Sequence, residues 1–183
     1  MKKTVLVAVY FSIILLIFFV IHLFASFLPE FEEYRCEKGG FSVLLPGKPR
    51  ETMEDYGLFF SRFNVTKVCS ETRDWTFMVM CIEPNEAYHS PSWARQPQEP
   101  SLEMMQMMAE VMTRGRLVSE KDVTCYGRPA KDFEFEILRR RKANVRAIAI
   151  DKRFYQLVVV GNSQKTLAKV PEFFDSFKID GVQ

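Results

Sequence analysis

The stretch Trp75-Thr76-Phe77-Met78-Val79-Met80-Cys81-Ile82 decides the fold. Successive side chains of a strand point to opposite faces, so Trp75, Phe77, Val79 and Cys81 would share one face, and Met78, Met80 and Ile82 the other. A strand that is apolar on both faces is typical of a position at the centre of a sheet, covered on each side. The run therefore predicts a central strand between two apolar layers.

The segment before this run predicts the other arm of a hairpin. A loop of Ser70 to Asp74 would set Cys69 opposite Trp75, and Cys81 opposite Phe63. On this register Cys69 and Cys81 do not bond each other. The apolar side chains that alternate along the first arm are Phe59, Phe63, Val65 and Cys69.

Further strands are expected on both sides of the hairpin. Phe41 to Pro46 reads as a strand that Pro46-Gly47-Lys48-Pro49 ends, because proline cannot donate to a ladder. Towards the C-terminus two antiparallel pairs are predicted. They are Leu117–Tyr126 with Ala130–Leu138, joined by Gly127-Arg128-Pro129, and Val145–Ile150 with Phe154–Val160, around Asp151-Lys152.

Two helical segments separate and follow these strands. Ser101 is a candidate N-cap and Gly115 a candidate C′ residue of a helix that aligns Leu102, Met105, Met108 and Met112 on one face. A final amphipathic piece runs from Ser163 to Ile179, with an interruption at Pro171. Pro84 to Pro100 has no periodicity and is expected to be a long loop. This order predicts an α+β domain with a mostly antiparallel sheet flanked by helices.

The N-terminus predicts a membrane anchor. Residues 4–28 carry no formal charge, follow Lys2 and Lys3, and precede three glutamates. A helix of ~37 Å, at ~1.5 Å per residue, crosses a ~30 Å hydrocarbon layer. Basic flanks stay cytoplasmic, so residues 1–3 are expected inside the cell and the rest outside. Cleavage near Ala25 or Ser26 is the alternative; both readings export the domain.

The remaining chain is expected to divide into a juxtamembrane linker, residues 29–39, and one exported domain, residues 40–183. The whole chain has a net charge of only +2, and such a balance argues against nucleic acid as the main partner. Cys36, Cys69, Cys81 and Cys125 admit three disulfide pairings, and the sequence does not choose among them.

Four stretches, in the same order, resemble the small exported domains of the PsbP-like and DcrB-like group. They are Phe41-Ser42-Val43-Leu44-Leu45-Pro46-Gly47-Lys48-Pro49, Gly127-Arg128-Pro129-Ala130-Lys131-Asp132-Phe133, Arg153-Phe154-Tyr155-Gln156-Leu157-Val158-Val159-Val160-Gly161 and Phe173-Phe174-Asp175-Ser176-Phe177-Lys178. The resemblance spans about residues 40–180. It implies an antiparallel sheet between helices and a mostly non-enzymatic group of accessory and assembly proteins. It transfers no metal ligand or binding residue to this chain.

Little in the sequence supports catalysis. His89 is the only histidine beyond the anchor, and it lies in the proline-rich tract, where an exposed histidine is the simpler reading. Glu134 and Glu136 share a strand face, but Phe133, Phe135 and Ile137 on the other face favour a solvated strand over an acid–base pair. We expect no enzyme activity, no cofactor and no metal site; a hydrolase centred on His89 is the enzymatic alternative.

Three clusters are candidate binding residues. Met104 and Met107 are the methionines of the helix that a single inward stripe cannot bury, and methionines form adaptable apolar surfaces. Tyr88 and Trp93 could anchor the long loop to a partner. Arg139, Arg140, Arg141 and Lys142 form a basic turn.

The sequence thus predicts a single-pass, membrane-anchored, extracytoplasmic accessory or assembly domain that acts by binding an envelope protein. The alternative is a carrier of Cu(I) or a small ligand that uses the methionine-rich helix, residues 101–115, because thioethers are soft ligands.

Overall fold

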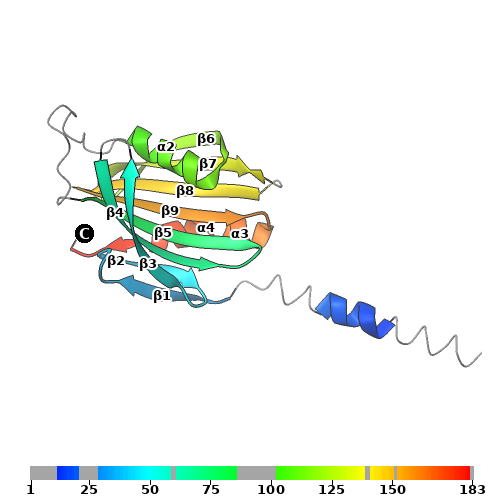
Figure 1. The fold of residues 1–183 in the computed structure, drawn as a ribbon. Helices are drawn as coiled ribbons and strands as arrows, with labels where there is room; N and C mark the ends of the chain where they lie inside the picture. Colours follow the sequence, from blue (N-terminus) through cyan, green and yellow to red (C-terminus); the bar gives the residue numbers. More distant parts are fainter. Residues whose placement is uncertain are drawn as a thin grey trace, which may run out of the picture.

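A computed structural model describes residues 12–20, 29–58, 61–85, 102–138, 141–150 and 152–181. Its main feature is a seven-stranded antiparallel sheet in the order β3-β4-β5-β9-β8-β7-β6 (Figure 1). The strands are β3 (Arg50–Leu58), β4 (Ser61–Glu71), β5 (Trp75–Pro84), β6 (Arg116–Cys125), β7 (Arg128–Ile137), β8 (Arg141–Ile150) and β9 (Arg153–Gly161).

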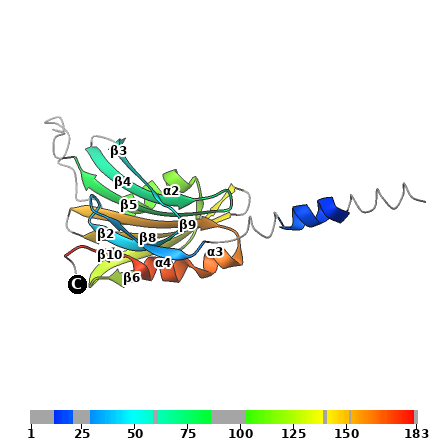
Figure 2. The same ribbon diagram turned by 90° about the horizontal axis from the view of Figure 1, so that it is seen from below.

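Further elements cover the two faces of this sheet. On one face lie α3 (Gln164–Ala168), α4 (Val170–Ser176) and a small sheet of β1 (Phe31–Cys36), β2 (Phe41–Pro46) and β10 (Lys178–Ile179). On the other lies α2 (Leu102–Thr113) (Figure 2). The predicted α+β class with a mostly antiparallel sheet flanked by helices is confirmed.

The central strand β5 lies between β4 and β9, as its sequence predicts. Its two faces belong to two separate apolar cores. Trp75, Phe77, Val79 and Cys81 pack towards the small sheet and α4, whereas Met78, Met80 and Ile82 pack towards α2. The strand is therefore buried on both sides.

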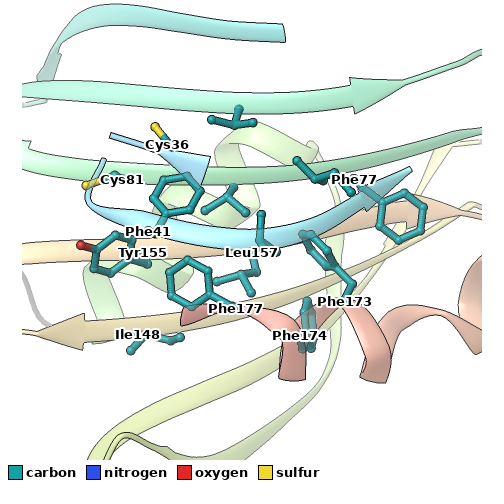
Figure 3. Close-up of a cluster of buried hydrophobic side chains, with 14 of the residues drawn as sticks. Cys36, Phe41, Phe77, Cys81, Ile148, Tyr155, Leu157, Phe173, Phe174 and Phe177 are labelled. Atoms are coloured by element: carbon teal, nitrogen blue, oxygen red, sulfur yellow. The ribbon is translucent and has the colours of Figure 1, made fainter. Parts of the chain in front are cut away.

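The first core is rich in aromatic rings (Figure 3). The ring of Phe77 meets those of Phe31, Phe173 and Trp75 edge-on, at centroid distances of 5.2, 5.4 and 5.7 Å. These partners come from β1, α4 and β5 itself. Phe77 therefore packs the large sheet against both β1 and α4.

The predicted register of the β4–β5 hairpin is wrong. Cys69 pairs with Met78 rather than Trp75, and Cys81 pairs with Thr66 rather than Phe63. The shift by three places Cys69 in the core under α2, and Cys81 in the opposite core. The two thiols thus lie on opposite faces of the sheet.

The physical reason for the register error lies at the turn. Ser70 and Glu71 continue β4 instead of joining the loop. Ser70 is buried, its hydroxyl hydrogen-bonds the carbonyl of Pro46, and Thr72 N donates to Trp75 O at 2.8 Å. The connection is therefore shorter than the predicted five residues.

Three strands lie where the sequence pattern predicted none, and one of them, β10, ends the segment from Ser163 to Ile179 that was predicted as helical. β1 occupies the segment expected to be a linker, residues 29–39, and pairs with β2 along its whole length. β3 follows the Pro46–Pro49 stop and pairs with β4. Both are edge strands with many exposed polar side chains, so neither has the strict apolar alternation that a sequence search detects.

Helix α2 ends differently from the prediction. Arg114, not Gly115, has the left-handed conformation, with φ 49°. Gly115 is needed for space, because a Cβ there would lie 2.8 Å from atoms of Phe135 and Ile137. Pro171 lies in the first turn of α4, where a proline removes no helical hydrogen bond, so it does not interrupt the helix.

Residues 12–20 form a helix whose side chains are all exposed. The rest of the predicted anchor, residues 4–28, lies outside the described residues. None of the helices in the described part of the chain has the length and hydropathy that a membrane crossing requires.

Candidate functional site

An apolar groove lies between α2 and the β3–β4–β5 half of the large sheet. Its hollow of about 310 Å³ is lined by Glu54, Tyr56, Gly57, Phe63, Val65, Lys67, Met80, Ile82, Met107, Met108, Val111 and Met112. Among the residues that the structure describes, Glu54 and Lys67 are the charged side chains of this lining. We call this the outer groove.

The position of α2 creates the outer groove. The helix packs chiefly against β7 and β8, whereas β3, β4 and β5 form the other half of the sheet. Met105 and Ala109 are buried against the sheet. The next stripe of the helix faces the gap: Met107 is 50 % exposed, Val111 70 % and Met112 44 %.

A second hollow of about 210 Å³ adjoins the first, and we call it the inner hollow. The two share Lys67, Met80 and Met112. The inner hollow is further lined by Cys69, Glu71, Thr76, Met78, Ala109, Thr113, Gln156, Val158 and Val160. The groove therefore continues between α2 and the sheet.

Gln156 is a buried polar group in this apolar setting. Its Nε2 donates to the carbonyl of Met105 at 2.7 Å, which ties β9 to α2. Its Oε1 has no hydrogen-bond partner among the described residues. Buried polar atoms without a partner are uncommon, so each one requires an explanation.

The predicted binding residues do not gather in one place. Met107 lines the outer groove, while Met104 is half-buried and packs against the core under α2. Arg141 and Lys142 open β8 instead of forming a turn. Tyr88, His89, Trp93, Arg139 and Arg140 lie outside the described residues.

The carboxylate pair of β7 is engaged in ion pairs. Lys142 Nζ lies 2.5 Å from Glu134 Oε1, and Arg116 Nη2 lies 2.7 Å from Glu136 Oε2. The hydrogen bond to Glu134 raises the pKa of Lys142. Each carboxylate therefore faces a cation on a neighbouring strand, as expected for a solvated strand face.

All four cysteines are free thiols, and only Cys125 is not fully buried. Burial raises the pKa of every one, to about 11 for Cys69 and about 12 for Cys81. A nucleophilic cysteine needs a lowered pKa, so these environments disfavour a role of the free thiols as nucleophiles. Across the described ranges no three His, Cys, Asp or Glu side chains group closely enough to hold a metal.

Part of the outer groove has no signal in the sequence pattern. Tyr56 belongs to β3, which was not predicted, and its wall position depends on the β3–β4 register. Val111 follows Met107 by one helical turn, so extending the methionine stripe by i+4 would have identified it.

Comparisons with known proteins bear on the fold. No family model matches the chain. No curated protein sequence matches it either. A solved structure is similar to this chain: cyanobacterial PsbP (CyanoP) from Synechocystis sp. PCC 6803. The two align with a TM-score of 0.51 and 11 % sequence identity, and the alignment covers 84 % of this chain and 95 % of the cyanobacterial one. An identity this low supports the architecture alone. The chain therefore has a PsbP-like fold, as the four sequence stretches indicated.

Proposed function

We propose that this protein is a membrane-anchored, extracytoplasmic accessory or assembly domain that binds another envelope protein and performs no catalysis. The observation that carries the proposal is the outer groove, which exposes Met107, Val111 and Met112 beside an apolar floor. Methionine side chains are flexible and adapt to varied apolar partners. An apolar segment of the partner, such as one face of a helix, fits a groove of this kind.

The N-terminal segment supplies the anchor in this proposal. The uncharged stretch of residues 4–28, after two lysines, is long enough to cross a bilayer with the domain outside. Anchoring would hold the groove near membrane-bound partners and raise its effective concentration towards them.

A charge in the outer groove should weaken partner binding. We expect Val111→Asp to weaken the complex at least about tenfold, or ~1.4 kcal/mol, because the carboxylate would be desolvated against an apolar segment. The fold should tolerate the change, since Val111 is largely exposed. The measurement is native mass spectrometry of the full-length protein, gently extracted from its own membranes.

Val118→Asp is the matched control. Val118 is also an exposed valine, but it lies on β6, the edge strand opposite β3. This variant should keep the partner. Equal retention of the partner by both variants would show that the outer groove is not the binding surface.

A further inference from the structure

The inner hollow is surrounded by sulfur atoms from three elements. Cys69 comes from β4, Met78 and Met80 from β5, and Met112 from α2. Cys69 and Met78 are direct partners in the β4–β5 ladder. Side chains directly opposite in a ladder have Cβ atoms ~4.5–5.5 Å apart, and diagonal neighbours such as Met80 follow at ~7–8 Å. Four sulfur-bearing side chains therefore converge on one small hollow.

From this convergence we propose that the inner hollow binds one soft monovalent metal ion of the Cu(I) class, with Cys69, Met78 and Met112 as ligands. Thiolate and thioether sulfur select Cu(I), whereas magnesium, calcium and manganese prefer oxygen ligands. The unbranched methionine side chain has three rotatable bonds, so its sulfur can adjust to a metal without a change in the backbone. Met112 also lines the outer groove, so the proposed ion would lie beside the partner-binding surface.

The surroundings of the hollow suit a monovalent cation. Cys69, Met78 and Met80 are buried, whereas Met112 is 44 % exposed, so the ion would lie between the sheet and the open side of the hollow. Gln156, whose Oε1 has no hydrogen-bond partner among the described residues, also lines this hollow. Lys67 and Glu71, the charged residues of the lining, have opposite signs. The charged side chains of the lining therefore cancel, and the sulfur atoms are the features that select a ligand.

This site differs from the copper alternative that the sequence suggested. Met107 lines the outer groove but not the inner hollow, and Met104 lines neither. The helix thus contributes Met112, while the sheet contributes the thiol and a second thioether. Only the β4–β5 register brings Cys69 and Met78 together.

Binding is a ligand exchange without electron transfer. The Cys69 thiol releases its proton to solvent as the sulfur–metal bond forms, and copper remains Cu(I) throughout. The ion must therefore be supplied in the reduced state.

The test is a competition titration of the full-length, fully reduced protein in detergent. The probe is Cu(I) held by bicinchoninate, with ascorbate present and oxygen excluded. The proposal predicts one Cu(I) per chain. Cys69→Ser and Met78→Leu should each weaken Cu(I) binding by at least about 100-fold. Loss of a residue that only supports a metal ligand weakens metal affinity by about 10- to 100-fold, and loss of a ligand itself should cost at least as much.

Two variants serve as controls. Cys125→Ser removes a thiol that does not line the hollow, and Met104→Leu removes a methionine of the same helix; both should bind as the unmodified protein does. Met78→Leu nearly conserves side-chain volume, so this variant should fold. Near-ultraviolet circular dichroism checks its fold, and the variant keeps the test valid even if Cys69→Ser misfolds. X-ray absorption at the copper edge should show sulfur neighbours alone.

The proposal is overturned if the protein takes no Cu(I) from the competitor, or if a correctly folded Met78→Leu binds as tightly as the controls. Loss of binding in Cys125→Ser would likewise reject it, because the copper would then sit on a different thiol.

Discussion

Truncation of Phe77 to alanine is expected to lower the free energy of unfolding by about 3–5 kcal/mol, the range typical of a fully buried phenylalanine. Phe77 has no exposed surface, and its ring contacts rings of β1 and α4. The substitution would leave a cavity between the large sheet and both covering elements. Partial collapse cannot fill it, because three rigid rings surround the site.

Urea unfolding of the detergent-solubilised protein, followed by tryptophan fluorescence, measures this loss. Leu138→Ala is the control, because the Leu138 side chain is 82 % exposed. It should change the free energy by no more than about 0.5 kcal/mol. A Phe77→Ala protein as stable as this control would mean that the aromatic core does not hold the layers together.

The second large effect is expected at Arg146, which fixes α4 to the sheet. Its Nε and Nη2 donate to the two carboxylate oxygens of Asp132 at 2.8 and 2.9 Å, and its Nη1 donates to Asp175 of α4 at 3.2 Å. The guanidinium carbon lies 4.8 Å from the centre of the Phe174 ring. These carboxylates raise the pKa of Arg146, against the opposing effect of burial.

Arg146→Met should lower the free energy of unfolding by about 3 kcal/mol, because the partly buried Asp132 carboxylate would lose both hydrogen bonds that Arg146 donates to it. The Arg146 side chain is only 16 % exposed, so water replaces the lost contacts poorly. Thermal and urea unfolding would measure the change.

The double variant Arg146→Met with Asp132→Leu tests whether the Asp132 carboxylate without its partner causes the loss of stability. Replacement of both charges by apolar groups is often neutral or stabilising, so most of the lost stability should return. If the double variant is no more stable than Arg146→Met, the loss comes from packing on Phe174 instead of the unpaired carboxylate.

The architecture could be predicted from the sequence where apolar side chains dominate. β5 and the β8–β9 hairpin have buried faces with clear alternation, and α2 has an apolar stripe, so all of them were found. β1 and β3 were missed because edge strands carry polar side chains on exposed faces. Their strand conformation depends on pairing with β2 and β4, which only the tertiary structure shows.

The candidate site was predictable only in part, because it depends on register. Met107 was identified from the helix alone. The pairing of Cys69 with Met78 was not, since the predicted register is wrong by three residues, and a shift by an odd number changes which faces of the two strands meet. The wall formed by Tyr56 required β3 to be recognised first.

The central claim is that the outer groove binds an apolar segment of a partner protein. The most direct measurement replaces Val111 by a photo-crosslinking phenylalanine analogue in cells and compares it with the same replacement at Val118. We predict a single protein adduct from position 111 and none from position 118, because only the former lies in the groove. No adduct at position 111, or the same adducts from both positions, would contradict the account.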